Sequence, residues 1–391
     1  MNSSVSRRVN RVPVNRWNQI PLMLTKQNVD VLVTVSPENV TYTSGHFEYT
    51  LPIIRDRISA TILPAEGEPV YLVVNQVEDA ARRNSWIKDV RIYKENAESP
   101  VAALARILTE KGFASGCIAI ESEFLTTGFF EELRGYLPNA RFCDGSIILA
   151  RARSVKTDEE VAFIEAAVKA TETAHLKVFQ ELRVGDTEVE IARRLCAQTL
   201  LEGADLVSQN TVSSGRNTLE GHHVPDATAI QPGDVIQTDT GGIFAGYWSD
   251  ISRQVVVGEP SSRQRSMWTK LRNAQREGVE CMRVGTKAGD AYTHLKGLER
   301  WDNIWPYGHG IGVLIHDIPM LLPYYESGLK TTTNFGTNWE LEPNMLVMVE
   351  FALFDREGGQ RYTFEDLVLV TDNGPRILSN VIDTTEMYVV A

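Results

Sequence analysis

Residues 235–257 read VIQTDTGGIFAGYWSDISRQVVV, with a β-branched run on each side of a centre rich in glycine and aromatic residues. Such runs around a turn predict a β-hairpin. If the chain reverses at Phe244 and Ala245, Asp239 lies directly opposite Asp250, with the two β-carbons roughly 4.5–5.5 Å apart. Two carboxylates held that close repel each other unless a cation or a shared proton lies between them. Two solvated aspartates at the ends of a hairpin are the alternative interpretation of this stretch.

A second stretch of the same design covers residues 345–374, MLVMVEFALFDREGGQRYTFEDLVLVTDNG. A reversal at Glu357 and Gly358 places Glu350 directly opposite Glu365. Each of these two glutamates lies inside an apolar run, where an ionised carboxylate is costly unless it is paired or bound to a metal. Two acid pairs on two hairpins therefore predict one polynuclear metal site.

A histidine adds a nitrogen ligand to this set. Residues 307–319 read YGHGIGVLIHDIP and place His309 between Gly308 and Gly310, so that little side-chain bulk hinders a close approach. A neutral imidazole with carboxylates suits manganese, cobalt, zinc or iron, whereas an all-oxygen set would suit magnesium or calcium. A lone histidine is more often structural, but beside four spaced acids we interpret His309 as a ligand.

With these residues assembled, the sequence resembles a known family. The motifs DTG, GYWSDISR, GHGIG, VE and EDLVLVT are similar to those of the creatinase, prolidase and aminopeptidase P family of pita-bread metallohydrolases. The resemblance is specific over residues 155–380, and only the layout agrees before them. All five candidate positions match ligand residues of that family. The resemblance implies a dinuclear centre in which Asp239 chelates one ion, His309 and Glu350 hold the other, and Asp250 and Glu365 bridge both.

Two further histidines stand at spacings where this family keeps histidines that contact substrate. His222 lies 17 residues before Asp239, and His316 lies seven residues after His309. The neighbouring His223 competes with His222 for the first role. A surface histidine in a polar loop is the structural alternative for His222.

The chemistry that these residues would serve is hydrolysis of an amide or a similar bond. Two divalent ions that share a water lower its pKa and produce a nucleophile, while one ion polarises the carbonyl oxygen. Glu350 would take the proton of the water and help to deliver it to the leaving nitrogen. His316 would donate a hydrogen bond to the developing oxyanion, and His222 would hold the substrate near the scissile bond.

The chain is long enough for two domains, because its 391 residues exceed the roughly 250–300 at which one hydrophobic core stops growing. Strand-like runs such as VDVLVTVS and GEPVYLVVN alternate with a helical pattern at residues 99–112, which predicts an α/β N-terminal domain over residues 1–155. A helix that begins near Thr157 or Asp158 would open an α+β pita-bread catalytic domain over residues 156–391.

Composition and charge exclude several classes of partner. The formal net charge of −12 offers no electrostatic footprint for nucleic acid or an anionic membrane, and no apolar run approaches the roughly 18 residues of a membrane span. The four cysteines are scattered, and the N-terminus lacks the apolar stretch of a secretory signal. We therefore expect a cytoplasmic protein whose partner is a small molecule or short peptide. The family resemblance also implies a homodimer.

The sequence departs from the peptidase pattern next to the last ligand. Prolidases and aminopeptidase P usually carry an arginine two residues before the last ligand glutamate, where this chain has Thr363. Arg361 lies two residues further back, on the same side of a regular strand. The five ligands are intact while part of their surroundings differs, so the sequence predicts the chemistry better than the substrate.

Aromatic residues surround the two histidines of residues 307–319. They could wall a substrate pocket, and packing in a core or an interface is the alternative. These aromatic residues are Trp301, Trp305, Tyr307, Tyr324 and Tyr325.

We therefore expect a dinuclear metal hydrolase of the Xaa-Pro dipeptidase or aminopeptidase type, with two divalent ions and manganese as the first candidate ahead of cobalt, zinc or iron. One alternative is a family member that acts on a non-peptide small molecule, as creatinase, ectoine hydrolase and sulfoniopropionate lyases do. A second alternative is a catalytically inactive binding protein. Inactive members typically lose metal ligands, whereas all five are present here.

Overall fold

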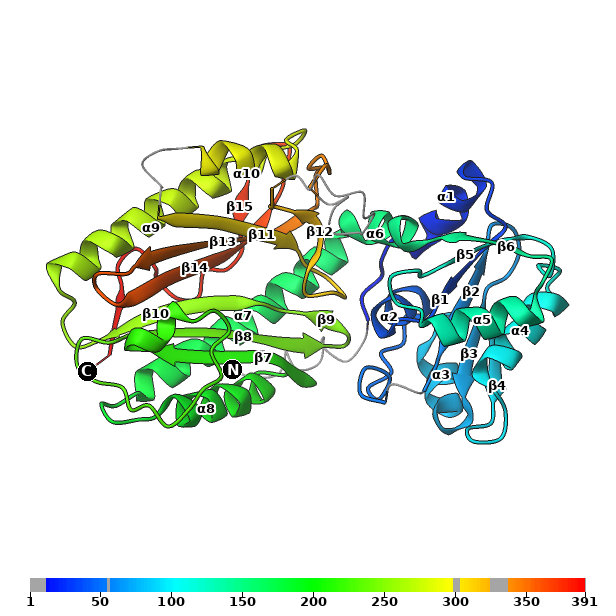
Figure 1. The fold of residues 1–391 in the computed structure, drawn as a ribbon, viewed down its shortest axis with the longest axis horizontal. Coiled ribbons are helices and arrows are strands. Elements are labelled where there is room, and N and C mark those ends of the chain that lie inside the picture. The colour runs from blue at the N-terminus through cyan, green and yellow to red at the C-terminus, as the bar shows by residue number, and fades with distance from the viewer. Residues whose placement is uncertain (1–11, 55–56, 298–302, 324–336, 391) are drawn as a thin grey trace. The chain divides into compact units, whose positions relative to one another are not determined.

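The computed structural model describes residues 12–54, 57–297, 303–323 and 337–390. The chain divides into two compact units, Arg11–Arg153 and Ser154–Ala391, both drawn in Figure 1. The exact boundary that the sequence predicts, between residues 155 and 156, stays a prediction.

The N-terminal unit is built on a six-stranded sheet of strand order β4-β3-β2-β1-β5-β6. Strand β2 runs antiparallel to β1 and β3, whereas the pairs β1–β5, β3–β4 and β5–β6 are parallel. The strands are β1 (Val31–Thr34), β2 (Ala60–Pro64), β3 (Val70–Val74), β4 (Asp89–Tyr93), β5 (Cys117–Ile120) and β6 (Arg141–Asp144). The helices are η1 (Trp17–Gln19), α1 (Ile20–Lys26), α2 (Pro37–Ser44), η2 (Asn75–Val77), α3 (Glu78–Asn84), α4 (Pro100–Glu110), α5 (Thr127–Tyr136) and α6 (Ser146–Ser154).

Two apolar clusters cover the opposite faces of this sheet. In β3, Leu72 and Val74 belong to the cluster that includes residues of α4 and α5, whereas Tyr71 and Val73 belong to the cluster with residues of α2 and α3. Successive side chains of a strand point to opposite faces, so a strand that is buried on both faces has a continuous apolar sequence. The strands and the helix predicted for this unit are therefore confirmed.

Within the described residues, the C-terminal unit has two halves of similar build, each with one sheet and two α-helices. The first sheet has the order β16-β10-β8-β7, with β9 paired to β8, and the second has the order β12-β11-β13-β14-β15. The first half contains α7 (Asp158–Glu181), α8 (Glu188–Leu201), β7 (Leu206–Ser214), η3 (Gly215–Leu219), β8 (Val235–Phe244), β9 (Tyr247–Trp248), β10 (Ile251–Val257) and β16 (Tyr388–Val390). The second half contains α9 (Ser262–Glu280), α10 (Ala288–Lys296), β11 (Ile304–Gly310), β12 (Asp317–Met320), β13 (Leu346–Asp355), β14 (Gln360–Leu369) and β15 (Arg376–Ile377).

The first long helix of this unit, α7, begins at a capping box. The hydroxyl of Thr157 accepts a hydrogen bond from the Glu160 amide at 3.1 Å, and the Glu160 carboxylate accepts one from the Thr157 amide at 2.9 Å. Each residue thus satisfies a backbone donor that the helix start leaves open. The N-cap is therefore Thr157 rather than Asp158.

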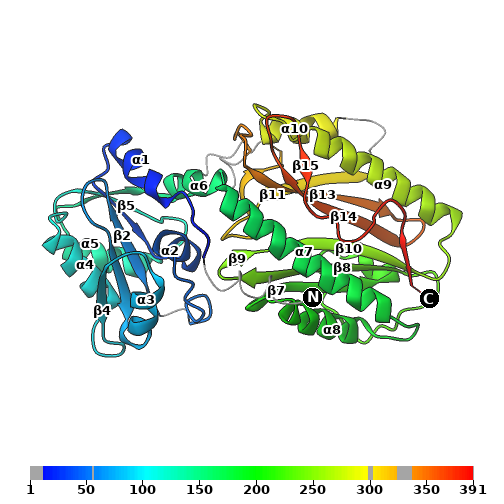
Figure 2. The same ribbon diagram turned by 180° about the vertical axis from the view of Figure 1, so that it is seen from behind.

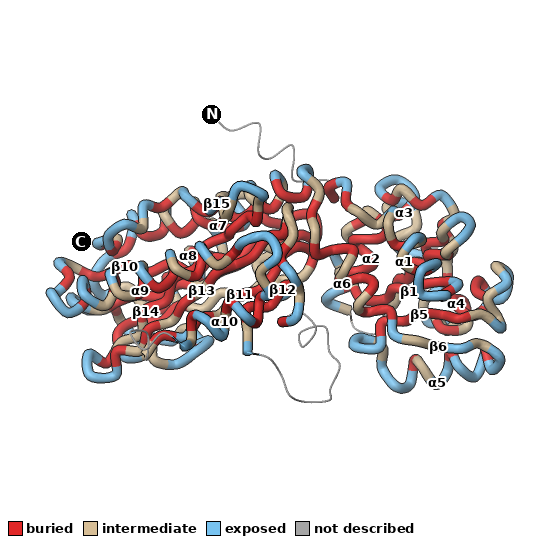
Figure 3. The backbone as a smooth tube through the Cα atoms, turned by 90° about the horizontal axis from the view of Figure 1, so that it is seen from above, coloured by how far each residue is buried: buried red, intermediate tan, exposed pale blue. Residues whose placement is uncertain are grey.

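The helices of the C-terminal unit cover one face of each sheet. Phe179 of α7 and Leu195 of α8 pack with apolar residues of β7, β8 and β10, and Trp268 of α9 packs with apolar residues of β13 and β14. Figure 2 shows α7, α8 and α9 in front of the strands, whereas Figure 1 shows the strands of both sheets from their other side. In Figure 3 the strands are drawn mostly in red, the colour of buried residues. The uncovered faces of the two sheets are therefore available to line a cavity.

No helix within the described ranges combines the length and the hydropathy of a membrane span.

Candidate metal centre

The first hairpin turns one residue later than the sequence predicts. Phe244 pairs with Tyr247, and the two residues between them, Ala245 and Gly246, have φ angles of 47° and 87°. A two-residue hairpin loop with positive φ at both positions has the twist that antiparallel strands require. The expected reversal at Phe244 and Ala245 was therefore wrong. Asp239 pairs with Ser252 instead of Asp250.

The two aspartates nevertheless share one face of the hairpin. Asp250 precedes the partner of Asp239 by two residues, and residues two apart on a strand point to the same side. The side chain of Gln209, on β7, joins them by donating to Asp250 Oδ1 at 2.5 Å and to Asp239 Oδ1 at 3.4 Å. Asp239 and Asp250 are thus diagonal neighbours that one amide holds together.

The second hairpin has the predicted register. Glu350 of β13 is the direct partner of Glu365 of β14. On its other side Glu350 pairs with Tyr307 of β11. His309 of β11 pairs with Met348, two residues from Glu350, so its side chain lies on the same face as the two glutamates.

His309 presents one ring nitrogen to the acids of both hairpins. Its Nδ1 donates to the carbonyl oxygen of Gly310 at 3.0 Å, which leaves Nε2 with a free lone pair. Nε2 lies 3.7 Å from Asp250 Oδ2 and 3.8 Å from Glu365 Oε1. Two ligands that are each about 2.1 Å from one ion at a tetrahedral angle stand roughly 3.4 Å apart, so these separations suit a shared cation.

The glycine before His309 allows this approach. A β-carbon on Gly308 would meet the main-chain oxygen of Met348 at 2.5 Å, a distance that real β-carbons essentially never show. Gly310 on the other side would clash with the main chain of Ile318 in the same way. Both glycines are therefore required where β11 lies between its neighbouring strands.

Burial opposes charge on the four carboxyl groups. It raises the pKa of Asp239, Asp250, Glu350 and Glu365, and for Glu350 the pKa rises to about 7. Repulsion from neighbouring acids raises the pKa of Asp250, Glu350 and Glu365 further. Burial, followed by repulsion from His316, lowers the pKa of His309 to about 3. A neutral imidazole beside crowded carboxylates is a donor set that fits a divalent transition-metal ion.

All five candidate ligands line one cavity of about 1120 Å³. The acids of the first sheet and those of the second meet in it, although the two pairs are about a hundred residues apart in sequence. The same cavity is lined by Gln209, His222, Gln237, Trp305, Tyr307, His316 and Arg361. The structure thus brings together the five candidate ligands and the two candidate substrate-contacting histidines, His222 and His316.

The two adjacent histidines of the first half, His222 and His223, have different surroundings. His222 is exposed, lines the cavity and has a φ angle of 54°, a left-handed conformation in which histidine is enriched among non-glycine residues. His223 is buried and contacts Glu188 through Nε2 at 2.9 Å and Glu220 through Nδ1 at 3.0 Å. His222 therefore has the position to touch a substrate, and His223 fixes the loop that carries it.

His316 lies against the candidate ligands. Its ring centroid is 4.1 Å from that of His309, and one potential ligand atom from each of Asp250, His309 and His316 lies within 4.8 Å of the other two. Its Nδ1 is 3.3 Å from the hydroxyl of Tyr307. Burial, followed by repulsion from His222, lowers the pKa of His316. His316 is therefore close enough to act on a molecule bound at the centre.

Arg361 reaches the cavity while Thr363 does not line it. Nε and Nη2 of Arg361 donate to the side-chain oxygen of Gln237 at 3.3 and 2.6 Å. Thr363 is 1% exposed, and its hydroxyl finds no hydrogen-bond partner within the described ranges. The guanidinium whose charge acts on Glu350 and Asp239 thus comes from a position on β14 two residues before that of the usual peptidase arginine.

The sequence did not identify the amides of Gln209 and Gln237 as parts of the site. The polar run SQN inside the strand LVSQNTVSS is the only local signal for Gln209, because the contact of its side chain with Asp239 depends on how β7 aligns with β8. Tyr307 and Trp305 line the cavity as the sequence allowed. Trp301, Tyr324 and Tyr325 lie outside the described residues.

Comparison with known families agrees with this geometry. Residues 162–372 match metallopeptidase family M24, and residues 16–155 match the creatinase/prolidase N-terminal domain. The chain belongs to metallopeptidase family M24. It is therefore a hydrolase of a family that uses metal ions, and the predicted family and fold class are confirmed.

Proteins similar to this M24 chain match it over most of its length. The Xaa-Pro dipeptidase of Lactobacillus helveticus is 27% identical over 360 residues, which cover 90% of this chain and 93% of that protein. The creatinase of Bacillus sp. (strain B-0618) is 25% identical over 377 residues, which cover 90% of this chain and 86% of that protein. The solved structure of an Xaa-Pro dipeptidase from Bacillus anthracis has a TM-score of 0.80 at 21% identity, covering 96% of this chain and 99% of that one, and shows a likeness of fold.

Proposed function

We propose that this M24 protein is a dinuclear metal hydrolase that cleaves the C–N bond of an amide in a small substrate, of the Xaa-Pro dipeptidase or aminopeptidase type. The observation that supports this most strongly is the convergence of one histidine and four acids from two sheets on one cavity. The likeness to an Xaa-Pro dipeptidase over 90% of the chain points to the same chemistry. Two divalent ions are proposed, with manganese as the first candidate.

In the proposed centre Asp239 would hold one ion, His309 and Glu350 would hold the other, and Asp250 and Glu365 would be shared by both. When bound, the ions supply an activated water and polarise the carbonyl oxygen of the scissile bond. The donor set fits this assignment because Nε2 of His309 faces Asp250 and Glu365 at 3.7 and 3.8 Å.

The remaining side chains move the proton and hold the substrate. Glu350 accepts the proton of the attacking water and passes it to the leaving nitrogen. The Tyr307 hydroxyl lies 3.3 Å from Nδ1 of His316 and donates a hydrogen bond to this Nδ1. The proton of the His316 ring is then on Nε2, where it stabilises the developing oxyanion. His222, on a loop of the first half, holds the substrate near the scissile bond.

Arg361 is proposed to bind a carboxylate of the substrate. Gln237 fixes the orientation of its guanidinium, and a fixed guanidinium pairs with a carboxylate in a planar, bidentate way. On a regular strand Arg361 starts roughly 6.6 Å from residue 363, toward the beginning of β14. Xaa-Pro dipeptides should therefore be cleaved poorly unless Arg361 spans that distance.

The second candidate function is hydrolysis of a non-peptide small molecule. It is favoured by Thr363, which is buried at the place of the usual peptidase arginine, and by the 25% identity to a creatinase. A catalytically inactive binding protein is the least favoured candidate, because all five candidate metal-ligating residues are present.

One experiment separates these candidates. Protein loaded with Mn, Zn or Co is assayed against Xaa-Pro dipeptides, other dipeptides, creatine and ectoine. We expect hydrolysis of a substrate that carries a carboxylate, and we expect Arg361→Ala to raise KM more than it lowers kcat. Turnover of creatine or ectoine without dipeptide cleavage would favour the second candidate. Absence of bound metal after reconstitution would contradict the hydrolase.

We also propose that the protein is a cytoplasmic homodimer that binds neither nucleic acid nor membrane. The formal charge of −12 supports the second part, because nucleic acid and anionic lipid repel such a surface. Light scattering at micromolar concentration tests the dimer, and a fully active monomer would contradict it.

A further inference from the structure

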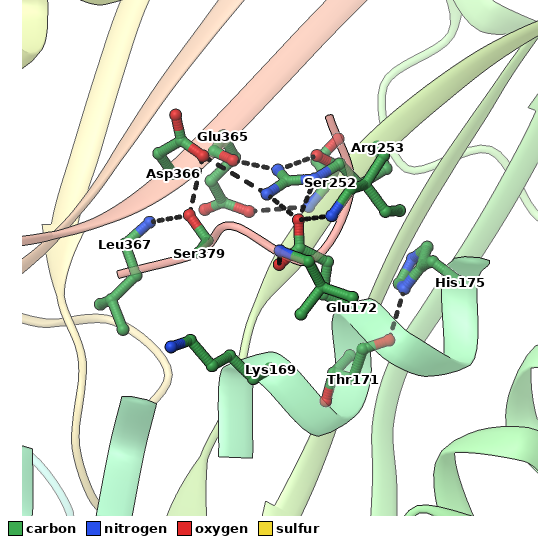
Figure 4. Close-up of polar contacts among 12 residues, drawn as sticks. Lys169, Thr171, Glu172, His175, Ser252, Arg253, Glu365, Asp366, Leu367 and Ser379 are labelled. Carbon is green, nitrogen blue, oxygen red and sulfur yellow. Dashed lines mark hydrogen bonds and ion pairs between the residues drawn. The ribbon is translucent and has the colours of Figure 1, made fainter. Parts of the chain in front are cut away.

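A buried arginine lies where the two sheets of the C-terminal unit meet. The side chain of Arg253, on β10, is 2% exposed. Figure 4 shows its guanidinium among acids from other elements. Nε and Nη2 donate to Glu172 Oε1 on α7 at 3.1 and 2.7 Å, and Nη2 donates to Asp366 Oδ1 on β14 at 3.3 Å. Both carboxylates are buried as well, so the charge of Arg253 is balanced without water.

The third nitrogen of Arg253 reaches the main chain of a candidate ligand. Nη1 donates to the Ser252 carbonyl at 3.1 Å and to the carbonyl oxygen of Glu365. The residues on either side of Arg253 also contact β14. The Ser252 amide donates to Glu365 Oε2 at 3.0 Å, and the Gln254 side chain donates to the Arg361 carbonyl at 3.1 Å. Three consecutive residues of β10 thus bind β14, although the two strands belong to different sheets.

These contacts lie directly behind the metal centre. Asp250, the residue before β10, lines the cavity, and alternation along the chain places Arg253 of β10 on the opposite face. The same rule places Glu365 on the cavity face of β14 and Asp366 behind it. The centre takes acids from both sheets, so the distance between its opposed carboxylates depends on how β10 and β14 are joined.

The partners of Arg253 are themselves fixed from several directions. Glu172 accepts hydrogen bonds from the amides of Val381 and Ile382 at 2.8 and 3.2 Å. Asp366 accepts hydrogen bonds from the Ser379 hydroxyl and the Gln275 side chain, both within 3 Å. The arginine, α7, β14 and the C-terminal segment therefore form one hydrogen-bonded cluster.

Stability alone does not account for a buried ion cluster. Well-packed apolar residues can often replace such a cluster without loss of stability, because removing charges from water is costly. Apolar side chains cannot supply what the guanidinium supplies, a rigid planar set of donors that fixes distances among several acceptors.

We propose that Arg253 is a positioning residue for the metal centre: it fixes the spacing of β10 and β14 so that the acids of the two sheets converge on the same ions. This inference rests on the dinuclear site of the proposed function. Groups that orient metal ligands from behind typically change metal affinity by about 10–100-fold when they are replaced.

Arg272 offers a matched control. It is a mostly buried arginine of α9 whose guanidinium lies 4.2 Å from the centre of the Phe364 ring, compared with 5.0 Å for Arg253. It also lies 3.8 Å from Asp366. Within the described part of the chain, Arg272 makes no hydrogen bond to β10 or to Glu365. The two arginines thus share a ring and an acid, and only Arg253 reaches a ligand.

The test compares Arg253→Lys with Arg272→Lys in the full chain. The affinity for Mn²⁺ is measured by competition with a chelating indicator, and the Tm of the metal-free protein is measured for each variant. We expect Arg253→Lys to weaken Mn²⁺ binding by about 10–100-fold and Arg272→Lys to change it less than about threefold. If Arg253→Lys does not fold, Asp366→Asn removes one of the two acids that hold Arg253 and should weaken Mn²⁺ binding more than Arg272→Lys does.

A lowered Tm with unchanged Mn²⁺ affinity in Arg253→Lys, or in Asp366→Asn if that variant is used, would overturn the positioning role and leave Arg253 a structural residue. That result differs from a failure of the proposed function, in which the wild-type protein itself would bind no Mn²⁺. Equal losses of Mn²⁺ affinity in the two arginine variants would also overturn the inference, because Arg272 does not reach the ligand.

Discussion

The two acid-bearing hairpins of the C-terminal unit bring their carboxylates together in different ways. In β13–β14, Glu350 and Glu365 are direct cross-strand partners. In β8–β10, Asp239 pairs with Ser252, and Asp250 is its diagonal neighbour. Direct partners have β-carbons about 4.5–5.5 Å apart and diagonal neighbours about 7–8 Å or somewhat less. The first hairpin therefore needs an additional contact, and Gln209 supplies it by donating to both aspartates.

The difference shows that the face of a strand matters more to this site than its pairing. The actual partner of Asp239 lies two positions from the expected one, and a shift by two keeps a side chain on the same face, whereas a shift by one would send it to the opposite face. Asp250 therefore lines the cavity although the predicted register of this hairpin was wrong. Substitutions that disturb one hairpin at a time test how much change in strand pairing the site tolerates.

The largest effect should come from removing a bridging acid of either hairpin. We expect Asp250→Ala and Glu365→Ala to lose both ions, because each of these acids is shared by both ions in the proposed centre, whereas Asp239→Ala should keep part of the metal. Elemental analysis of reconstituted protein measures the ions per chain. Asp372→Ala, which removes an exposed acid just after β14, is the control and should keep wild-type metal content. Two ions retained in either bridging variant would show that the hairpins bind metal independently.

A smaller effect should separate the two neighbouring histidines of the second half. His309→Ala should lower metal occupancy, since Nε2 faces acids of both hairpins. His316→Ala should keep the metal and lower kcat by roughly 10²–10³, the typical loss for one oxyanion donor. Metal content and steady-state kinetics of both variants check this. Because one potential ligand atom of His316 lies within 4.8 Å of one from His309, equal metal loss in both would make His316 a ligand instead.

The sequence was sufficient where the relevant contacts are local. The register of β13–β14 follows from two apolar strands around a short glycine turn, and it was predicted correctly. The register of β8–β10 depends on Ala245, which adopts a left-handed conformation that alanine seldom takes. Nothing in the local sequence distinguishes this turn at Ala245 and Gly246 from the expected turn at Phe244 and Ala245.

Contacts between distant segments could not be predicted. Gln209 reaches Asp250 across 41 residues, and Arg253 reaches Glu172 and Asp366 across 81 and 113 residues. Sequence patterns report which face of a strand is apolar, but they do not report how two sheets join. The candidate ligands could thus be chosen from the sequence, while the groups that hold these side chains in place were found only in the structure.

The turns of the two hairpins offer a third, weaker test. Gly246 and Gly359 have φ angles of 87° and 70°, so alanine at either position should cost about 1–2 kcal/mol of stability. Gly246 is four residues from Asp250, whereas Gly359 is six residues from Glu365. We expect Gly246→Ala to weaken Mn²⁺ binding severalfold and Gly359→Ala to leave it nearly unchanged. Thermal unfolding and Mn²⁺ titration measure both, and equal binding by the two variants would show that the first hairpin needs no special turn.

The smallest effect concerns the loop that carries His222 in the first half. His223 contacts Glu188, Glu220 and the side chain of Asn217, and Asp226 lies nearby. Burial lowers the pKa of His223, but the hydrogen bonds and charges of Glu220 and Glu188 outweigh burial and raise the pKa above its ordinary value.

A histidine whose pKa is raised by folding stabilises the fold in its protonated form. That contribution is fully present below the pKa of the unfolded chain, about 6.5, and is lost as the pH rises through the higher pKa of the folded protein. His223→Gln should therefore lower Tm by roughly 2–4 °C near pH 6, which corresponds to about 1 kcal/mol in a unit of this size, and by less at alkaline pH. Glu188→Gln, which removes the buried partner charge, should reduce the pH dependence. A Tm difference between wild type and His223→Gln that stays the same from acid to alkaline pH would mean that His223 holds the His222 loop as a neutral hydrogen-bonding group, without an ion pair.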